Sequence, residues 1–389
     1  MNESTVTGVE HSRWMRKALR LALRGRGCVE PNPMVGCVVV RGGLLLGEGW
    51  HRGFGGPHAE VEALADCRRR GHDAAGGDVY VTLEPCCHHG KTGPCTKALI
   101  EAGVRRVFAA MQDPFQEAAG QGLTALGDAG IAVEVGLCED LARRLNEPYL
   151  KRVCSGLPWV IAKWAQTLDG RIATAKGDSQ WISNEISRRW VHRLRGRVDA
   201  VMVGIGTVLK DDPLLTAREL PVRRIARRVV VDPKLHIEES CAMLEACGEG
   251  EQVTPPVTIG VGAYVRDQAR EKWRQLEARG VELVALPQVE SGDKGIDLRP
   301  LLEHLTATHS ATNVLVEGGA GLVGHLFRQG LVDQVLVFIA PKLLADERAI
   351  PAVRGFSRES IVDATAMELR RVKRLGDDVA LDYRVRGIG

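Results

Sequence analysis

Two stretches, GPHAEV at residues 56–61 and TLEPCCHHGKTGPC at residues 82–95, decide the fold of the first half of this 389-residue chain. The first stretch places His58 two residues before Glu60, after a proline of the kind that often opens a helix. The second stretch follows a short apolar run and contains the pairs Pro85-Cys86 and Pro94-Cys95. These residues predict a strand, a loop with cysteines and a helix, arranged around a metal site in a layered α/β domain.

Histidine and two cysteines are the ligands that zinc uses in enzymes that remove an amino group from a pyrimidine or purine ring. Three protein ligands leave the fourth zinc position open for water, which is typical of catalytic sites. Zinc lowers the pKa of that water from about 15.7 towards 7. Glu60, which need not be a ligand, is placed to carry a proton from the water to the leaving amine. We therefore predict a catalytic zinc site with His58 and Cys86 as ligands and Glu60 as the proton shuttle.

The third zinc ligand is ambiguous on the residues alone. The usual signature has its two cysteines in a Pro-Cys-x-x-Cys pattern, but position 89 is histidine here and the next cysteine after Cys87 is Cys95. Spacing leaves three candidates for the third ligand, which are Cys95, His88 and His89.

Chain length predicts two domains, because single domains usually hold roughly 100–200 residues. We expect one domain at residues 1–153 and a second at 154–389, separated near a Cys-Ser-Gly-Leu-Pro segment. In the first domain, apolar periodicity predicts helices at 11–24, 58–70, 94–102, 120–129 and 139–151, and strands at 34–40, 44–49, 79–83, 106–110 and 131–135. In the second it predicts helices at 184–194, 265–279, 298–306 and 321–329, and strands at 159–164, 200–203, 228–232, 257–261, 281–285, 314–316, 335–339 and 379–385.

A glycine-rich segment, GAGLVG at residues 319–324, follows a predicted strand and opens a predicted helix. Backbone N–H groups at such a helix start bind phosphate well. A Rossmann domain would also need an acidic residue at the end of the next strand, and that strand ends at Ala340 without one. We therefore predict a phosphate-binding loop in a fold that is not a Rossmann domain.

Composition excludes several classes of protein. The net charge is only +3 and aromatic residues make up 4% of the chain, so neither a nucleic-acid surface nor a base-stacking platform is expected. No apolar run reaches the roughly 20 residues that span a bilayer. Ten dispersed cysteines and the absence of a signal-peptide pattern predict a reducing, cytoplasmic location. The sequence leaves open whether the chain forms a homo-oligomer.

The quoted stretches resemble the RibD family of bifunctional riboflavin biosynthesis enzymes, and the resemblance extends over nearly the whole chain. It implies an N-terminal cytidine-deaminase-like α/β/α domain and a C-terminal α/β domain like dihydrofolate reductase. It also implies that the zinc ligands are His58, Cys86 and Cys95. The implied reactions are hydrolytic deamination of a diaminopyrimidinone ribosyl phosphate and NADPH-dependent reduction of the ribosyl side chain to ribityl.

The resemblance further assigns contacts position by position. In the deaminase domain the implied substrate contacts are Asn32, His51, Lys91 and Asp113. In the reductase domain the implied NADPH contacts are Ala165, Trp181, Thr207, Asp211, Gly319, Ala320 and Gly321, and the implied substrate contacts are Lys163, Ser179, Arg195, Leu215, Arg218 and Glu317. A proton donor is also needed for the reduction, and Asp211 and Lys163 are the candidates.

Two positions depart from the family pattern. Cys87 replaces a usual serine, and Phe115 replaces a usual asparagine that would offer a polar substrate contact. Three alternatives therefore stay open: a nucleic-acid base deaminase, a structural zinc module joined to a nucleotide-sensing domain, and an enzyme in which one half has lost its activity. Glu60 argues against the structural module, since a closed four-ligand zinc site has no use for it.

Overall fold

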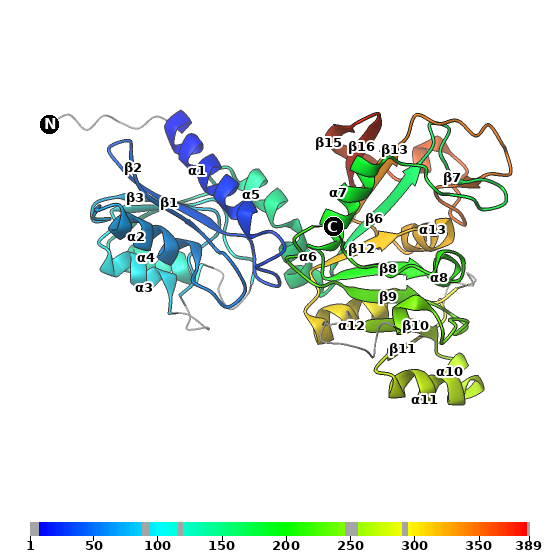
Figure 1. Ribbon diagram of the computed structural model, residues 1–389. Helices are drawn as coiled ribbons and strands as arrows, with labels where there is room; N and C mark the ends of the chain where they lie inside the picture. The colour runs from blue at the N-terminus through cyan, green and yellow to red at the C-terminus, as the bar shows by residue number, and fades with distance from the viewer. Residues whose placement is uncertain are drawn as a thin grey trace. The chain divides into compact units, whose positions relative to one another are not determined.

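The chain folds into two compact units, Met1–Gly156 and Leu157–Gly389 (Figure 1). The computed structural model describes residues 8–87, 93–115, 120–218, 220–245, 256–289 and 295–386. The two-domain organisation expected from the length of the chain is confirmed.

The first unit is built on a five-stranded sheet with the strand order β2-β1-β3-β4-β5. Strand β1 pairs antiparallel with β2 and β3, whereas β3, β4 and β5 run parallel. The strands are β1 (Gly36–Arg41), β2 (Leu44–Trp50), β3 (Asp78–Val81), β4 (Arg106–Ala109) and β5 (Ala132–Val135). The helices are α1 (Gly8–Ala22), η1 (Leu23–Gly25), α2 (Ala59–Arg69), α3 (Cys95–Glu101), α4 (Gln121–Asp128), α5 (Glu139–Leu145) and α6 (Glu147–Ser155).

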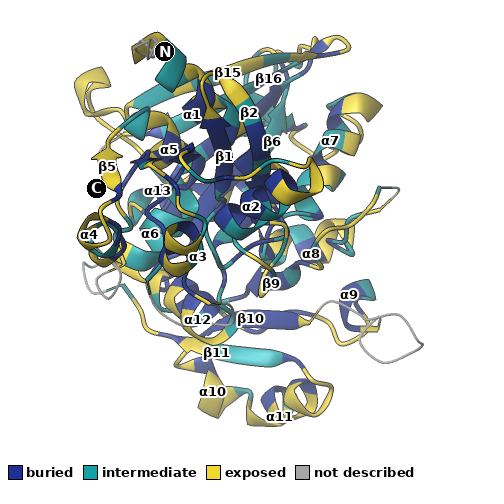
Figure 2. Cartoon of the chain, turned by 90° about the vertical axis from the view of Figure 1, so that its left-hand side faces the viewer, coloured by how far each residue is buried: buried dark blue, intermediate teal, exposed yellow. Residues whose placement is uncertain are grey.

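Both faces of this sheet are covered, as the alternation along β1 shows. Val38 and Val40 pack on one face with α1 and α5, while Cys37 and Val39 pack on the other with α2, α3 and α4. Successive strand side chains point to opposite faces, so one strand can serve two cores. Figure 2 shows β1 as a dark blue, buried strand. The expected α/β/α layering of the first domain is confirmed.

One predicted helix of this unit is wrong in its extent. Residues 139–151 form two helices, α5 and α6, with a break at Asn146. Pro148 lies in the first turn of α6, where it lacks the N–H that a continuous helix would need. The buried Asn146 side chain instead accepts a hydrogen bond from Met34 N at 2.8 Å and donates one to Met34 O at 3.0 Å. The break therefore ties the helices to the chain just before β1.

The second unit contains a nine-stranded sheet with the order β11-β10-β9-β8-β12-β6-β13-β16-β15. It is parallel from β11 to β13, and β16 and β15 add an antiparallel hairpin at one edge. Its strands are β6 (Trp159–Gln166), β8 (Ala200–Gly204), β9 (Arg227–Val231), β10 (Val257–Gly262), β11 (Glu282–Leu286), β12 (Asn313–Glu317), β13 (Gln334–Ile339), β15 (Met367–Leu375) and β16 (Asp378–Val385).

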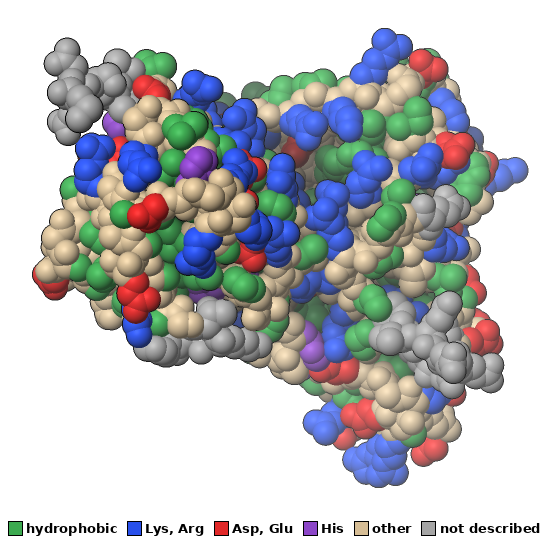
Figure 3. Space-filling model, turned by 60° about the vertical axis from the view of Figure 1, so that its left-hand side comes forward, with side chains coloured by type: hydrophobic (Ala, Val, Ile, Leu, Met, Phe, Trp, Pro, Cys, Tyr) green, Lys and Arg blue, Asp and Glu red, His purple; other side chains and the backbone are tan. Residues whose placement is uncertain are grey.

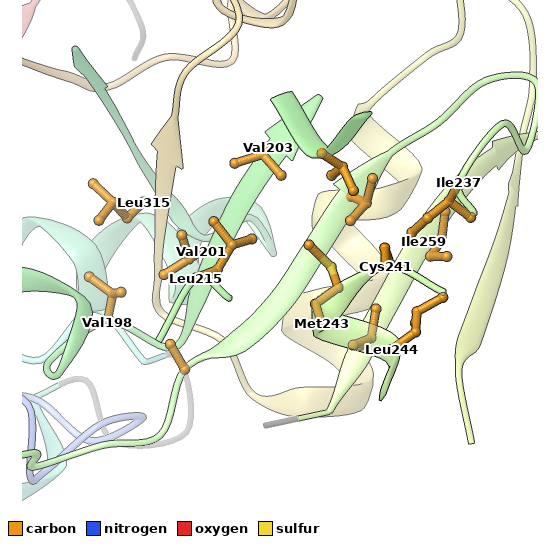
Figure 4. Packing of buried hydrophobic residues seen from close by; sticks show 14 of the residues in the cluster. Val198, Val201, Val203, Leu215, Ile237, Cys241, Met243, Leu244, Ile259 and Leu315 are labelled. Carbon is orange, nitrogen blue, oxygen red and sulfur yellow. The ribbon is translucent and has the colours of Figure 1, made fainter. Parts of the chain in front are cut away.

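The helices of the second unit cover both faces of its sheet. They are α7 (Glu185–Arg195), α8 (Ile205–Asp211), α9 (Ala242–Glu245), α10 (Val265–Gln268), α11 (Arg270–Ala278), α12 (Arg299–His309), α13 (Ala320–Arg328) and η2 (Ile361–Asp363). Figure 4 shows one of the two cores, where Val201 and Val203 of β8 pack with Leu215, Ile259 and neighbouring side chains. The buried parallel strands explain the continuous apolar runs of the sequence.

Several elements of the second unit escaped prediction. Strands β7 (Arg171–Ala173) and β14 (Ile350–Pro351) form a separate two-stranded sheet, and β15 lies at the edge of the large sheet. Strand β15 has the sequence MELRRVKRL, and most of its side chains are exposed or half-buried. A strand without a buried face shows no regular apolar alternation, so periodicity could not find it. Helix α8 is short, and the predicted helix at 265–279 is divided into α10 and α11.

No helix within the described ranges combines the length and the apolar character needed to cross a membrane.

Candidate active sites in the two units

Helix α2 carries the first candidate site of the N-terminal unit and lies directly on strand β2. A Cβ atom added at Gly49 would lie 2.4 Å from Ala63 N, and one at Gly47 would lie 2.5 Å from Ala63 O. Real Cβ atoms do not approach so closely, so these glycines are required for the helix to sit at this distance. His58 is the N-cap residue of α2, and Glu60 is in its first turn.

The structure brings His58, Cys86 and Cys95 together. The Cys95 Sγ and Cys86 Sγ atoms lie 3.3 and 3.4 Å from His58 Nδ1, and the three potential ligand atoms all lie within 4.8 Å of one another. Cys95 is the first residue of α3, and its N–H donates to Cys86 Sγ at 3.4 Å. One imidazole and two thiols in this arrangement fit a zinc ion with an open fourth position. His88 and His89, the alternative ligands, lie outside the described residues.

The two thiols of this cluster shift each other's pKa in opposite directions. Hydrogen bonds from Cys95 and from His58 lower the pKa of Cys86 to about 4, although burial opposes this shift. The Cys86 thiol therefore ionises readily. The pKa of Cys95 is raised, because its thiol hydrogen-bonds to Cys86 and is buried. A thiolate is the form of cysteine that binds a metal.

Glu60 lies beside the cluster and is only 3% exposed. Burial, followed by the negative charge of Cys86, raises the pKa of Glu60 to about 7. A carboxyl group with that pKa can both accept and release a proton near neutral pH. Its environment thus suits the proton transfer that the sequence predicts for it.

His51 and Asn32 lie next to each other beside the metal cluster. The Nδ1 atom of His51 is 3.0 Å from the carbonyl oxygen of Pro57, so Nδ1 carries a proton and donates it. Burial lowers the pKa of His51, which favours the neutral ring with Nε2 as an acceptor. Asn32 Nδ2 lies 3.4 Å from this Nε2. The amide nitrogen of Asn32 is thereby engaged, and its carbonyl oxygen is left for another donor.

Asp113 is positioned by three neighbours. Its carboxylate accepts from Tyr149 OH and from Phe115 N, both at 3.0 Å. Its own N–H donates to Glu84 Oε2 at 3.3 Å. Glu84 also accepts from the N–H groups of Gly120 and Gly122 at 3.0 and 2.9 Å. Glu84, which belongs to the Leu-Glu-Pro-Cys stretch, therefore organises the loops around the site.

A cavity of about 360 Å³ joins these groups within the first unit. Its lining includes Asn32, His51, His58, Glu60, Cys86, Asp113, Phe115, Tyr149 and Arg152. The expected deaminase residues Asn32, His51, Glu60 and Asp113 thus share one cavity with His58 and Cys86, two of the candidate zinc ligands. Lys91 lies outside the described residues. The lining residues Tyr149 and Arg152 were missed because α6 shows only ordinary helical spacing in the sequence. Cys87 is 3.7 Å from Gln121 Oε1 and does not belong to the ligand cluster.

A larger cavity of about 1480 Å³ lies in the second unit. Every residue that resemblance assigned to NADPH or to the reductase substrate lines it: Lys163, Ala165, Ser179, Trp181, Arg195, Thr207, Asp211, Leu215, Arg218, Glu317, Gly319, Ala320 and Gly321. The volume exceeds that of an ordinary ligand pocket, which is about 300–1,000 Å³. It leaves room for a dinucleotide and a second molecule together.

A buried charge cluster forms part of this cavity wall. Arg195 Nε and Nη2 donate to the two oxygens of Glu317 at 2.5 and 3.0 Å, and Lys163 Nζ lies 3.6 Å from Glu317 Oε2. Burial opposes ionisation of Glu317, but Arg195 and Lys163 outweigh it and lower the pKa of Glu317 to about 2. Burial also lowers the pKa of Lys163. Arg195 is therefore not a solvated member of a basic helix, because two of its nitrogens hold Glu317 and a third holds Thr216 O at 3.2 Å.

The glycine-rich segment connects β12 to α13. Gly318 and Gly319 have φ angles of +83° and +79°, a backbone conformation that side chains rarely tolerate. Thr207 Oγ1 lies against them, within 3.6 Å of where a Cβ of Gly319 would be. Gly324 has a different role, because its Cβ would lie 1.7 Å from Arg354 O. The last glycine of the motif serves packing, and only the first part of the segment faces the cavity.

Other parts of the cavity wall come from the segments after β7 and β8. Trp181 is 60% exposed, and the Arg188 guanidinium lies 4.6 Å from the centroid of its ring. Asp211 is exposed at the end of α8. The turn formed by Leu168, Asp169 and Gly170 after β6 is structural, since Asp169 accepts from Ala345 N at 2.9 Å and from Thr167 Oγ1 at 2.6 Å.

The fold and the two cavities define a two-domain enzyme with a zinc-type deaminase site and a separate site of reductase type. Comparisons with known families agree with this class. Residues 9–111 match the cytidine and deoxycytidylate deaminase zinc-binding region, and residues 158–381 match the RibD C-terminal domain.

Curated relatives match over nearly their full length. The chain is 37% identical to riboflavin biosynthesis protein RibD of Aquifex aeolicus over 371 residues, covering 95% of this chain and 97% of the relative. It is 40% identical to RibD of Escherichia coli K12 over 382 residues, covering 95% and 97%. Acinetobacter baumannii RibD has a similar structure, with a TM-score of 0.83, 34% identity and coverage of 98% and 100%. The chain belongs to the RibD family, so the resemblance seen in the sequence is confirmed.

A further solved structure agrees with this assignment. It is a diaminohydroxyphosphoribosylaminopyrimidine deaminase/5-amino-6-(5-phosphoribosylamino)uracil reductase from Thermotoga maritima. The TM-score is 0.81 at 31% identity, and the match covers 97% of this chain and 99% of that chain.

Proposed function

We propose that the chain catalyses two consecutive steps of riboflavin biosynthesis. The first is hydrolytic deamination of 2,5-diamino-6-ribosylamino-4(3H)-pyrimidinone 5′-phosphate in the cavity of the first unit. The second is NADPH-dependent reduction of the ribosylamino side chain in the cavity of the second unit, which gives 5-amino-6-ribitylaminouracil 5′-phosphate. The observation that carries the proposal is the cluster of His58, Cys86 and Cys95 beside the buried carboxyl group of Glu60.

The zinc ligands in this proposal are His58, Cys86 and Cys95. When bound, zinc supplies a hydroxide near neutral pH. Glu60 takes the proton that the water releases and delivers it to the departing amine, a transfer supported by its raised pKa of about 7. The free carbonyl oxygen of Asn32 accepts from an N–H of the pyrimidinone, and the neutral ring of His51 holds the Asn32 amide in that orientation.

Asp113 and Tyr149 complete the substrate contacts of the deaminase site. Tyr149 OH and Phe115 N both donate to Asp113 Oδ1, so the carboxylate is held in place in the cavity lining, where it accepts from a hydroxyl group of the ribose. Phe115 offers the cavity an aromatic side chain that is 39% exposed. An apolar group there can pack on the substrate but cannot hydrogen-bond to it.

In the reductase cavity the loop from Gly319 to Gly321 and Thr207 bind phosphate groups of NADPH. Helix α13 starts at Ala320, so its free N–H groups face that position. NADPH supplies the hydride, and reduction at C1 of the ribosyl unit also needs a proton. Lys163 is the better proton donor of the two candidates, because burial lowers its pKa whereas Asp211 is exposed.

Glu317 and Arg195 position Lys163 in this scheme. Arg195 already donates hydrogen bonds to Glu317 and Thr216. We therefore assign binding of the reductase substrate's phosphate to Arg218, which is exposed in the cavity wall. Ser179, Leu215 and Trp181 complete the walls around the two molecules.

The partners in this proposal are small phosphorylated molecules, and the chain acts in the cytoplasm. Two observations support this part. Figure 3 shows both basic and acidic side chains at the surface, and the net charge of the chain is only +3, whereas nucleic-acid-binding proteins are commonly strongly basic. The cysteines of the described ranges are unbridged, as is usual in a reducing compartment.

The decisive experiment follows both steps with purified, zinc-loaded protein. The diaminopyrimidinone substrate should release ammonia, and NADPH should then be oxidised in equal amount. Oxidation of NADPH by the deaminated compound without any ammonia release from the first substrate would overturn the bifunctional proposal.

A single substitution tests the catalytic carboxyl group. Glu60→Ala should abolish ammonia release while the zinc content and the reductase activity stay at the wild-type level. Loss of zinc from this variant would instead make Glu60 a metal ligand.

A further inference from the structure

Arg152 lines the deaminase cavity of the first unit and carries a positive charge that the scheme above does not use. It lies on α6, and of the described residues that line the deaminase cavity it is the only lysine or arginine. The same wall includes its helix neighbours Tyr149 and Val153. Within the described lining, Arg152 is therefore a single guanidinium among acidic, histidine, neutral polar and apolar side chains.

The guanidinium of Arg152 is uncommitted within the described part of the chain. Its Nε atom is enclosed by protein and has no hydrogen-bond partner there, and no described residue forms an ion pair with it. Buried donors in native proteins nearly always have partners, and an exception calls for an explanation. Arg152 also lines the cavity, so an anionic ligand there can bring oxygen acceptors to its guanidinium group.

Two acids of the cavity lining, Glu84 and Asp113, are by contrast already engaged by other donors. Glu84 accepts from three backbone N–H groups, those of Asp113, Gly120 and Gly122. Asp113 accepts from Tyr149 and Phe115. Neither carboxylate turns towards Arg152 to form an ion pair, so the positive charge is available to an anion from outside.

The proposed substrate carries such an anion on its ribose. We propose that Arg152 binds the 5′-phosphate of the deaminase substrate and so makes this site selective for the phosphorylated compound over its nucleoside; this rests on the function proposed above. A guanidinium presents several N–H donors in a plane and binds phosphate oxygens in pairs. Phe115, which lines the same cavity, offers no polar group to the phosphate, so α6 provides the cation that recognises it.

The test compares two substrates on three proteins. Deaminase kcat/KM is measured with the phosphorylated substrate and with its dephosphorylated nucleoside, using wild type, Arg152→Gln and Arg143→Gln. Arg143 is the matched control, because it lies on neighbouring α5, is more than half exposed and pairs with Glu139 at 2.7 Å. Reductase activity and zinc content are measured on each variant, and wild-type values exclude misfolding.

Arg152→Gln should lower kcat/KM for the phosphorylated substrate by about 10- to 100-fold, the effect of losing a charge-assisted hydrogen bond. Most of that loss should appear in KM. Activity on the nucleoside should stay within about twofold of wild type, Arg152→Lys should recover part of the loss, and Arg143→Gln should change neither substrate.

The proposal is overturned if Arg152→Gln keeps the wild-type preference for the phosphorylated substrate, and equally if Lys91→Gln alone removes that preference. If the proposed deaminase function itself is wrong, the result differs, because wild-type protein would then release ammonia from neither substrate.

Discussion

Lys163 and Glu317 are register partners on the neighbouring parallel strands β6 and β12, and Lys163 Nζ lies 3.6 Å from Glu317 Oε2. Arg195 approaches the same carboxylate from the end of α7. One carboxylate thus pairs with two largely buried cations, whose side chains are 16% and 15% exposed. The arrangement places Lys163 at the cavity wall, and the negative charge of Glu317 offsets part of the positive charge there.

Glu317→Gln should therefore destabilise the second unit strongly. Removing one partner of a buried ion pair costs about 3–5 kcal/mol, because the charges that remain lose their compensation. Urea denaturation followed by tryptophan fluorescence measures the change in the free energy of unfolding. Glu239→Gln is the control, since its carboxylate is 3.9 Å from Arg279 at the surface and such pairs contribute at most about 1 kcal/mol. Equal effects of the two substitutions would contradict the assigned role of Glu317.

The stability of the second unit should also depend on pH through Glu317. The folded-state pKa is about 2 against an ordinary value of 4.5. A depressed pKa means that the ionised carboxylate stabilises the fold above about pH 4.5, and that this contribution disappears as the pH falls towards 2. The difference in unfolding free energy between wild type and Glu317→Gln should shrink steadily from about pH 5 to pH 3. A constant difference over this window would show that Glu317 is not the titrating group.

Zinc binding should distinguish Cys95 from Cys87. Cys95→Ser removes one of the three clustered ligand atoms, and hydroxyl groups are poor zinc ligands, so the purified variant should lose most of its zinc and its deaminase activity. Cys87→Ser should keep both, because Cys87 lies outside the cluster. Metal analysis by mass spectrometry after dialysis gives the zinc content. Zinc retained by Cys95→Ser would bring His88 and His89 back as ligands.

Two glycines of one motif should respond differently to alanine. At Gly324 a Cβ would meet Arg354 O at 1.7 Å, so Gly324→Ala should lower the melting temperature of the reductase unit. A Cβ added at Gly321 would meet no described atom within 4 Å apart from its own stretch of helix, so Gly321→Ala should fold normally. Gly321→Ala should instead raise the KM for NADPH, because the methyl group blocks close approach of a phosphate. Thermal melting and reductase kinetics on both variants provide the measurements, and a stable Gly324→Ala would refute the packing role.

The sequence predicted the chemistry of the deaminase site better than its surroundings. His58, Cys86 and Glu60 follow from residue types and spacing. The third ligand required either the family resemblance or the folded structure, since Cys95 and the two histidines fit the spacing equally well. Tyr149 and Arg152 could not be predicted from spacing, because they reach the cavity only through the break at Asn146 that directs α6. That break depends on a contact with Met34, which is 112 residues away in the sequence.

The second unit shows the limits of periodicity more clearly. Its buried parallel strands were found from their apolar runs, whereas β15 was not, because an edge strand with few buried side chains carries no such pattern. Arg195 illustrates the same point for a single residue. Its place in a basic helix suggests a solvated charge, and only the fold brings Glu317, 122 positions later, against it.

Gly47 and Gly49 of β2 add a final consequence for the deaminase. They touch no substrate, yet a single methyl group at either position would meet the backbone of α2 at about 2.5 Å and force the helix away from the sheet. That helix carries Glu60 and begins at His58. A substitution at either glycine would therefore inactivate the deaminase by displacing α2. This would happen even though neither glycine carries a functional group and all reactive side chains of the site remain present.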